Sequence, residues 1–363
     1  MARRFHVFGL AHQPVNGLVS SCAYTAKVKN MCIMLGRAGH EVHLYHAGSM
    51  IDSFEGLPIV GHQVVSDKAM EMAYGARFCE TYNQQWEEDD RPWQEFRRRA
   101  GVLVGRNLTD KGDIVLASFG CAHQGCCPSS SAAMVVEMGV GYEGIFAKRK
   151  VWESYAWRHF MYGRKPSSDP SFDTVIPGYY RAGDFQVRHT TDVRGPLLFL
   201  GRVRDDKGVL EAYQAAMTAG TKLVIAGPGD PEWIKTNMPE AEYMGMVGPR
   251  ERASLLLESS ALVCYSKYIE PFGNVAIEAM ATGIPVISSD WGAFTETVIP
   301  GRTGYRCSSV HQLVAAIRSI HTSGQDWAPN CTSFASNFEL KAIWPRYEAY
   351  FENQHELFIH TGS

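Results

Sequence analysis

The amino-acid sequence predicts an α/β protein made of two domains, each a parallel sheet covered by helices. At 363 residues, the chain is longer than one hydrophobic core usually supports. Short apolar runs alternate with helical patterns, as they do in doubly wound sheets. The alternation stops at a polar passage near residues 180–195 and then starts again, which places the domain boundary there.

The first half opens as a β-α-β unit. Buried strands are predicted at Phe5–Leu10, Glu41–His46 and Asp113–Ser118. A helix is predicted from about residue 21 to residue 38, and Gly39 ends it.

The second half repeats this pattern. Strands are predicted at Leu197–Leu200, Leu223–Ala226, Ala261–Cys264 and Pro285–Ser288, and helices at about 207–219, 250–259, 274–281 and 311–320. The amphipathic tail Phe338–Phe358 is expected to pack back across the first domain. We therefore expect a first domain at 1–185, a second domain at 186–336 and a C-terminal helix at 337–363.

Composition indicates a soluble protein. Apolar residues make up 45% of the chain and charged residues 20%, close to the globular average, and no segment is long and apolar enough to span a bilayer. Two basic residues precede an apolar run in Met1–Leu10, but the run is too short for a signal peptide. A cytoplasmic location is the expectation.

The cysteines indicate free thiols rather than disulfides. Their number, nine, is odd, and they are scattered except for a cluster of Cys121, Cys126 and Cys127. The cluster contains no CxxC pair, so buried or free thiols in a reducing compartment are favoured over a metal site.

Two basic runs stand out against the net charge of −3. Residues 91–111 contain six basic side chains, as do residues 148–165. These runs are interpreted as solvated helix faces. The alternative is that they meet an anionic acceptor such as a phospholipid head group at a membrane surface, a phosphorylated glycan or nucleic acid.

Glu270 and Glu278 form the most specific motif in the chain. They flank a Pro-Phe-Gly-Asn turn that leads into a predicted helix, whose first-turn amides would attract an anion such as a diphosphate. If both glutamates were helical, they would lie about 12 Å apart along the axis. One carboxylate could then bind sugar hydroxyls, and the other could bind the diol of a ribose.

A basic segment, Gly201–Gly208, directly follows the predicted strand at 197–200. Ligands of doubly wound sheets bind beyond the carboxyl ends of the strands, where Arg202 and Lys207 would stand. Two fixed cations can offset the charge of a leaving diphosphate, a task that a divalent metal performs in other enzymes. Because the chain has no clear Asp-x-Asp motif, we expect no metal requirement and no cofactor.

The segment from Gly201 to Gly304 resembles the donor domain of glycosyltransferase family 4, a large retaining GT-B family. The resemblance rests on pieces in the family's order: Gly201-Arg202, Lys207-Gly208, Ile225–Gly229, Gly245–Val247, Glu270–Glu278, Ala281–Val286 and Gly301–Gly304. It implies a GT-B fold, in which two Rossmann-like doubly wound domains face a central cleft and a C-terminal helix crosses back to the first domain.

The resemblance also implies roles for individual residues. Arg202 and Lys207 would contact the diphosphate, Glu270 the donor sugar and Glu278 the ribose. The backbone amides of the helix start would face the phosphates, and neighbouring residues would flank the base or complete the donor site. These further donor-site residues are Gly201, Met246, Val247, Phe272, Gly273, Asn274 and Val275.

One segment departs from the family pattern. After the strand that begins with Pro285-Val286, family members have paired glycines, whereas this chain has Trp291. Trp291 either reshapes the sugar pocket or packs against its surroundings.

The resemblance is looser in the first domain. Gly17 lies where family members have a glycine-bearing loop that approaches the diphosphate, and His123 lies where similar enzymes place a histidine beside the donor sugar. The segments 137–144 and 151–157 are rich in glycine, acids and aromatic rings. They either recognise the acceptor or pack as a long helix, with Glu137 as a candidate near the cleft.

Together these patterns predict a retaining, metal-independent hexosyl- or pentosyltransferase. It would move a sugar from a nucleotide-diphosphate sugar to a hydroxyl of a glycan, lipid or small molecule, with His123, Arg202, Lys207 and Glu270 as the catalytic set. One alternative is a transferase that modifies hydroxylated DNA or another anionic polymer. A nucleotide-sugar-binding protein or a GT-B epimerase is a further alternative.

Overall fold

The computed structural model describes residues 2–15, 22–50, 54, 56–78, 86–109, 112–129, 132–164, 169–188 and 195–361. The chain divides into two compact units. Unit 1 contains Met1–Glu153, Met161–Pro177 and Trp344–Ser363, and unit 2 contains Ser154–Phe160 and Gly178–Ile343. The domain limits expected from the sequence stay predictions.

Unit 1 is built on a parallel sheet with the strand order β3-β2-β1-β4-β5-β6-β7. The strands are β1 (Arg4–Phe8), β2 (Glu41–Ala47), β3 (Ile59–Val65), β4 (Ile114–Ala117), β5 (Met134–Val140), β6 (Arg149–Trp152) and β7 (Thr174–Val175). The three strands predicted in the first half are confirmed as β1, β2 and β4, which lie side by side in the middle of the sheet.

The helices of unit 1 begin and end where local chemistry allows. They are α1 (Ala23–Arg37), α2 (Asp67–Tyr74), α3 (Arg91–Asn107) and α4 (Cys121–Gln124). Side chains of Ser66 and Asp90 cap α2 and α3 by accepting hydrogen bonds from first-turn amides. Gly39, at φ 81°, takes a left-handed conformation just after α1, as the sequence predicted.

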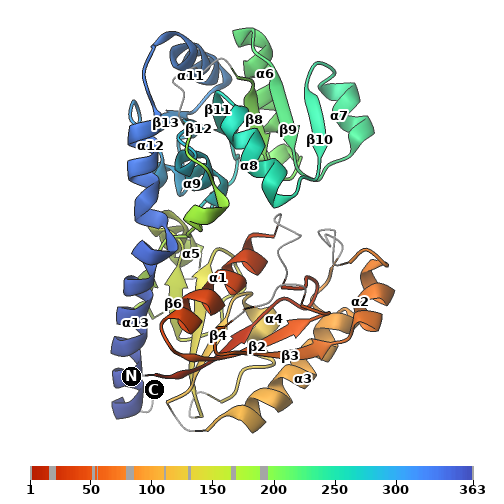
Figure 1. Ribbon diagram of the computed structural model, residues 1–363, viewed down its shortest axis with the longest axis vertical. Helices are drawn as coiled ribbons and strands as arrows, with labels where there is room; N and C mark the ends of the chain where they lie inside the picture. The colour runs from red at the N-terminus through yellow and green to blue at the C-terminus, as the bar shows by residue number, and fades with distance from the viewer. Residues whose placement is uncertain are drawn as a thin grey trace. The chain divides into compact units, whose positions relative to one another are not determined.

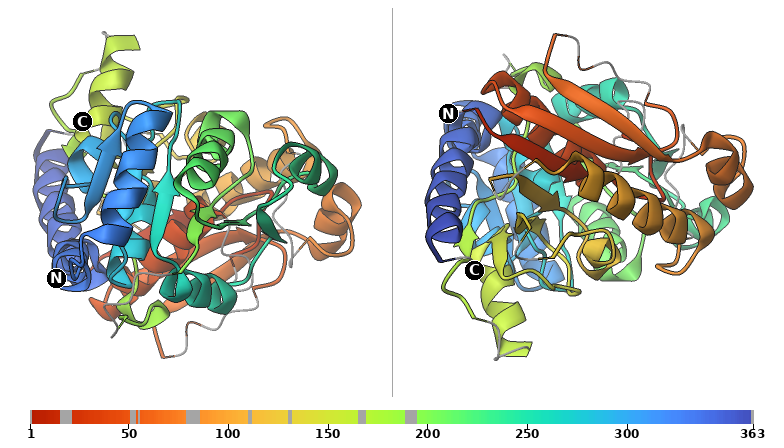
Figure 2. Two further views of the ribbon diagram at one scale, coloured as in Figure 1. Left: turned by 90° about the horizontal axis from the view of Figure 1, so that it is seen from above. Right: turned by 90° about the horizontal axis from the view of Figure 1, so that it is seen from below.

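Two helices continue from unit 2 into unit 1: α5 (Tyr155–Arg164) and α13 (Leu340–Thr361). The C-terminal helix predicted from the tail is present, and it packs on the start of β1 (Figure 1 and Figure 2). The ring of Phe351 meets that of Phe5 edge-on at 5.2 Å. Gln354 accepts a hydrogen bond from Arg149 Nε at 3.2 Å, so α13 also binds β6.

Unit 2 contains a second parallel sheet, with the order β10-β9-β8-β11-β12-β13. Its strands are β8 (Leu197–Leu200), β9 (Leu223–Ala226), β10 (Glu242–Gly245), β11 (Ala261–Cys264), β12 (Val286–Ser289) and β13 (Gly304–Cys307). The four predicted strands are confirmed as β8, β9, β11 and β12. The two strands that the sequence analysis missed, β10 and β13, are the edge strands.

The helices of unit 2 surround this sheet. They are α6 (Val209–Ala219), α7 (Pro231–Asn237), α8 (Pro249–Glu258), α9 (Asn274–Ala281), α10 (Phe294–Thr297), α11 (Val310–Thr322) and α12 (Ala328–Ala335). Helix α6 packs beside α11, and α9 packs beside α12 (Figure 1). Short 3₁₀ turns are formed by Ala182–Asp184, Asp205–Lys207 and Ser336–Phe338.

In the part of the chain that the structure describes, no helix is both long enough and apolar enough to cross a bilayer. The cytoplasmic location stays a prediction.

Candidate functional site

The candidate site of unit 2 lies where its strand order reverses. The chain passes from β8 to β9 on one side, while β11 pairs with β8 on the other. Loops after such neighbouring strands diverge, and open α/β sheets bind ligands at this point. In this protein the two loops touch, because Gly208 has φ 69° and a Cβ there would lie 2.0 Å from the carbonyl oxygen of Tyr265.

Lys207 and Glu270 meet between these two loops. Lys207 lies in the 3₁₀ turn after β8, and its Nζ is 2.9 Å from Glu270 Oε2. The same oxygen accepts hydrogen bonds from Ser266 Oγ at 2.8 Å and from the Tyr268 hydroxyl at 2.7 Å. No hydrogen bond to Glu270 Oε1 occurs within the described ranges. The carboxylate is therefore fixed through one oxygen and keeps the other for a ligand.

The surroundings keep Glu270 ionised. Burial alone would raise its pKa, but the Lys207 ammonium and the hydrogen bonds from Lys207, Tyr268 and Ser266 outweigh burial and hold the pKa below its ordinary value. Tyr268 also donates to this cluster and contacts Lys207 Nζ. Burial and the charge of Glu270 raise the pKa of Tyr268, so its hydroxyl stays a donor. The sequence analysis missed Tyr268 and Ser266.

Arg202 lies in the same loop after β8, and its side chain is exposed. Its positive charge acts to lower the pKa of Tyr268, against the larger effect of burial. Among the described residues Arg202 forms no ion pair, so its charge is available to an anion.

Helix α9 begins at Asn274, as predicted. Gly273 precedes it at φ 79°, and a Cβ there would lie 2.7 Å from the Phe294 ring. Phe272 is buried in the core of unit 2 rather than exposed toward a ligand. Glu270 lies in the loop before the helix, so the separation of about 12 Å expected for two helical glutamates does not apply.

Glu278, on α9, forms an ion pair with Arg252 on α8. Each side chain is 14% exposed. Burial lowers the pKa of Arg252 to about 10, so the guanidinium stays charged at neutral pH. The sequence analysis missed this pair, since Arg252 stands in a polar helix start, 26 residues before Glu278, with no local motif around it.

The remaining predicted donor-site residues lie in loops after strands of the same sheet. Met246 is 40% exposed and Val247 is 7% exposed, just after β10. Gly201 directly follows β8. Trp291 packs edge-on against Tyr265 at 5.9 Å, and its Nε1 donates to the Tyr268 carbonyl at 3.2 Å. Of the two interpretations of Trp291, packing is the one that these contacts favour.

In unit 1, His123 joins two loops at the corresponding point of the sheet, between β1 and β4. Its Nδ1 accepts a hydrogen bond from Ser118 N at 3.3 Å, and its Nε2 donates to the Gly9 carbonyl at 2.8 Å. The ring is fully buried, and burial lowers its pKa to about 3. Both ring nitrogens are thus engaged by the backbone, and the catalytic role expected for His123 stays a prediction. Gly17 lies outside the described residues.

The segment around Glu137 is not a long helix, so that interpretation is wrong. Residues Met134–Val140 form β5. Successive side chains point to opposite faces of the sheet, and nearly all of them are buried because both faces are covered. Glu137 is buried and accepts hydrogen bonds from the backbone of Phe146 at 2.9 Å and Ala147 at 2.8 Å. Burial nevertheless raises its pKa to about 7. Glu137 therefore orders the loop after β5.

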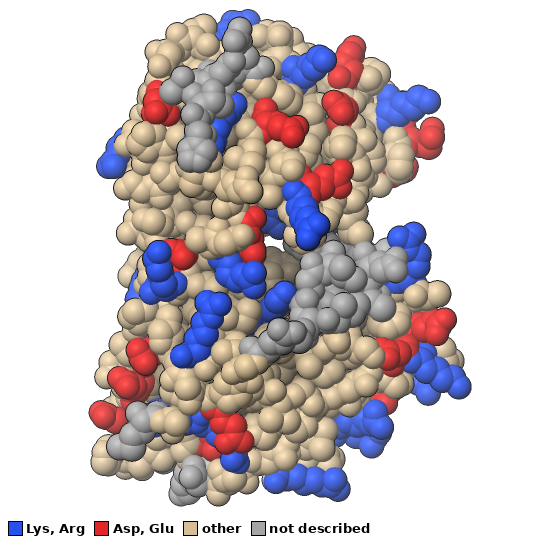
Figure 3. Space-filling view, in the orientation of Figure 1, with Lys and Arg blue, Asp and Glu red and all other residues tan. Residues whose placement is uncertain are grey.

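The basic run 148–165 is a helix face only in part: Arg158 and Arg164 lie on α5, where Arg164 is exposed, whereas the prediction is wrong for Arg149 and Lys150. Arg149 and Lys150 are buried in β6, where Lys150 Nζ lies 3.2 Å from Asp173 Oδ1. In the run 91–111, Arg97 and Arg99 on α3 pair with Asp89 and Glu95. On the face drawn in Figure 3, basic and acidic side chains are interspersed on both units. The case for a polyanion surface is correspondingly weaker.

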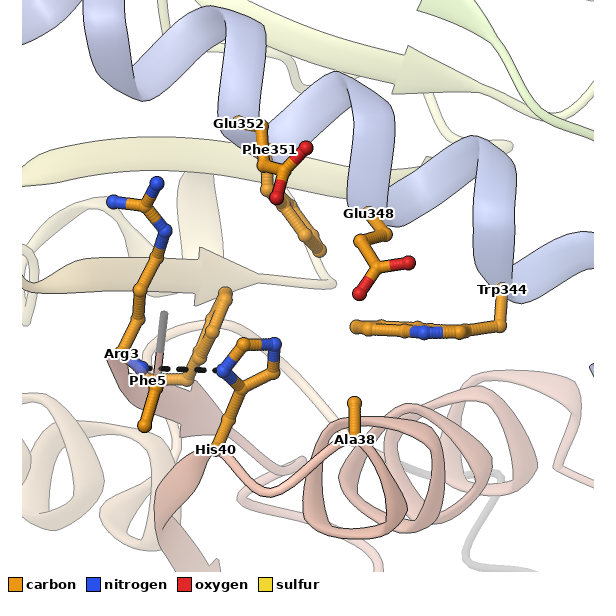
Figure 4. A pocket seen from close by; sticks show the side chains of 9 residues that line it. Arg3, Phe5, Ala38, His40, Trp344, Glu348, Phe351 and Glu352 are labelled. Atoms are coloured by element: carbon orange, nitrogen blue, oxygen red, sulfur yellow. Dashed lines mark hydrogen bonds between the residues drawn. The ribbon is translucent and has the colours of Figure 1, made fainter.

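A cavity of about 210 Å³ lies at the opposite edge of the unit 1 sheet, where the strands begin. Trp344 and Glu348 of α13 line one side, and Phe5 and His40 line the other (Figure 4). Since His123 stands at the carboxyl ends of the same strands, this cavity is separate from the predicted site.

Comparison with known proteins finds a family match for a segment of unit 2. Residues 194–323 match the family model described as Glycosyl transferases group 1. The glycogen synthase of Mycobacterium tuberculosis is 35% identical over 150 residues, which cover 38% of this chain and 36% of that protein. The D-inositol 3-phosphate glycosyltransferase of Rhodococcus erythropolis is 28% identical over 262 residues, or 64% of this chain and 56% of that protein. The chain thus spans about half the length, or less, of these relatives.

A solved structure extends the likeness to the whole chain. Sucrose-phosphate synthase from Thermosynechococcus elongatus has a TM-score of 0.73 at 17% identity, covering 99% of this chain and 98% of that one. This confirms the GT-B fold class, and the family match confirms the resemblance to group 1 glycosyltransferases.

Acid should destabilise unit 1 through its buried histidines. Burial, aided by His123, lowers the pKa of His12 to about 3, so folded His12 stays neutral while unfolded His12 takes up a proton near pH 6.5. Its contribution to stability is present above pH 6.5 and is lost as pH falls toward about 3. By linkage, the loss is about 1.4 kcal/mol per pH unit. Thermal unfolding followed by circular dichroism between about pH 6 and about pH 4.5 measures it.

His12→Phe is the matched variant, because a phenyl ring can keep the stacking of His12 on Trp86, whose ring centroid lies 4.6 Å away. The variant should show a shallower pH dependence than the wild type. Glu137 has a raised pKa, so its contribution to stability increases as pH falls, and this contribution is the same in the wild type and in the variant. Identical pH slopes would contradict the assignment of a buried neutral His12.

Proposed function

We propose that this protein is a retaining, metal-independent glycosyltransferase that moves a sugar from a nucleotide-diphosphate sugar to a hydroxyl acceptor. The observation that carries the proposal is the meeting of Lys207 and Glu270 at the point where the strand order of unit 2 reverses. The segment that holds both residues is similar to group 1 glycosyltransferases. The names of the two relatives are compatible with a glycan or a small molecule as acceptor, and a lipid stays an alternative.

The diphosphate would bind to positive groups from three sources. Lys207 and the exposed Arg202 supply full charges after β8. The first-turn amides of α9, at Gly273, Asn274 and Val275, supply partial charges and hydrogen-bond donors. In this pose Glu270 faces the donor sugar, Glu278 the ribose, and Met246 and Val247 the base.

The chemistry we propose is a same-face displacement. The bond between the anomeric carbon and the diphosphate oxygen breaks, and the acceptor oxygen forms its bond on the same face. The departing diphosphate takes the acceptor's proton, so no protein base is required. Lys207, Arg202 and the α9 amides stabilise the negative charge that builds on the leaving group.

Glu270 is suited to hold the sugar rather than to attack it. Its Oε2 is occupied by three donors, including the Lys207 ammonium, which lowers the nucleophilicity of the carboxylate. Its Oε1 remains available to accept a hydrogen bond from a sugar hydroxyl.

A thermal-shift screen with UDP-, GDP-, ADP- and dTDP-sugars tests the central proposal. We expect at least one donor class to raise the melting temperature, because a ligand that binds only the folded state stabilises it. Mass spectrometry should then detect slow hydrolysis of that donor. Once an acceptor is known, the coupling constant of the product's anomeric proton in an NMR spectrum reports whether the anomeric configuration is retained or inverted. Lack of stabilisation by all four classes would overturn the proposal.

The two ends of the donor should respond to different variants. Glu278→Ala should weaken nucleotide binding roughly ten- to a hundredfold, since hydrogen bonds to a charged group contribute about 1.5–3 kcal/mol. Lys207→Ala should chiefly lower kcat, by roughly 10²–10³, because its charge acts on the leaving group. Calorimetry and initial rates measure the two effects. Glu242→Ala and Lys235→Ala change exposed side chains of the same unit and serve as controls. Unchanged affinity in Glu278→Ala would remove the ribose role.

Excess EDTA should leave the transfer rate unchanged, because Arg202, Lys207 and the α9 amides carry the charge that a divalent ion would otherwise carry. The rate is measured before and after chelation and again after Mg²⁺ or Mn²⁺ is restored. Loss of activity in EDTA with recovery on adding the metal would contradict this part of the proposal.

A further inference from the structure

Each carboxylate of the proposed donor site is paired with a cation through one oxygen. Glu270 Oε2 accepts a hydrogen bond from Lys207, and Glu278 Oε2 forms an ion pair with Arg252. Within the described parts of the chain, neither Glu270 Oε1 nor Glu278 Oε1 accepts a hydrogen bond. Each glutamate is thus neutralised by one cation and still has one acceptor oxygen to offer.

Arg252 is well placed to fix the carboxylate of Glu278. It lies in the first turns of α8, and its backbone amide donates to Gly248 O at 2.9 Å. Its guanidinium carbon lies 6.0 Å from the centre of the Phe185 ring, which covers it on one side. The planar guanidinium binds a carboxylate in a defined orientation, and the low exposure of both side chains limits competition from water.

The pair also removes an electrostatic conflict. A nucleotide diphosphate is strongly anionic, and an unpaired glutamate beside it would repel it. Lys207 cancels this repulsion for Glu270, and Arg252 cancels it for Glu278.

We infer that Arg252 is a positioning residue that orients Glu278 for the two hydroxyls of a ribose, and so makes the nucleotide site select ribonucleotides over 2′-deoxyribonucleotides. This inference rests on the proposed function. A diol donates to a carboxylate at lower entropic cost when the free oxygen is already held in one orientation. A 2′-deoxyribose provides one donor fewer, and the desolvated carboxylate then stays incompletely satisfied. Of the four donor classes, dTDP-sugars are therefore disfavoured.

The test compares the affinities of UDP, GDP and ADP with those of dUDP, dGDP and dADP by calorimetry. The wild type should prefer the ribose form of the nucleotide that it binds by about tenfold. Arg252→Met should weaken binding of the ribose form and bring the ratio close to one. Arg252→Lys, which keeps the charge but loses the planar fork, should give an intermediate ratio.

Two further variants separate positioning from folding. Arg250→Met changes an exposed arginine of the same helix and should keep the wild-type ratio. In a Glu278→Gln background, Arg252→Met should leave the ratio unchanged, because Arg252 then has no carboxylate to orient. Melting temperatures of all variants establish that they are folded, and Arg252→Lys serves if Arg252→Met does not fold.

The outcomes distinguish this inference from the proposed function. If the wild type binds none of the six nucleotides, the proposed function fails and the inference fails with it. If it binds ribonucleotides and deoxyribonucleotides equally, or if folded Arg252→Met or Arg252→Lys keeps the full wild-type ratio, only the inference is overturned. A ratio that falls to the same value in Arg252→Met and in Glu278→Gln supports it.

Discussion

The contact between the loops that follow β8 and β11 is the constraint on which the candidate site depends. The backbone at Gly208 comes so close to Tyr265 that only glycine fits. Because the two loops are so close, Lys207 after β8 can reach the carboxylate of Glu270 after β11. Ser266 and Tyr268 then fix that carboxylate through hydrogen bonds. The loops after β8 and β11 diverge at the carboxyl edge of the sheet, and these contacts hold them together where a ligand would bind.

In unit 1 the corresponding loops, after β1 and β4, are held together by His123. The strand order of unit 1 also reverses between two central strands, and His123 ties the loop after β4 to the carbonyl of Gly9 after β1. A neutral imidazole suits this task, because it accepts from one backbone group and donates to another while fully buried. The thiols of Cys126 and Cys127 donate to the His123 carbonyl, so the cysteine cluster supports this turn.

Whether a strand could be predicted from the sequence depends on how deeply the strand is buried. Central strands such as β8 and β11 are covered on both faces, so they appear as continuous apolar runs and were predicted correctly. The edge strand β10 has only four residues, is half exposed and contains no continuous apolar run, so the sequence pattern does not reveal it. Arg149 and Lys150 resembled surface residues, because only the fold reveals partners such as Asp173. Arg252 was missed for the same reason: an ion pair between two helices leaves no local pattern.

The path of the chain has a consequence for biosynthesis. Unit 2 is almost one continuous segment, whereas unit 1 needs α13, which is translated after all of unit 2. On the ribosome, residues 1–153 must therefore wait with the surface around Phe5 uncovered until Phe351 and Gln354 emerge. The unit whose synthesis begins first is therefore completed last.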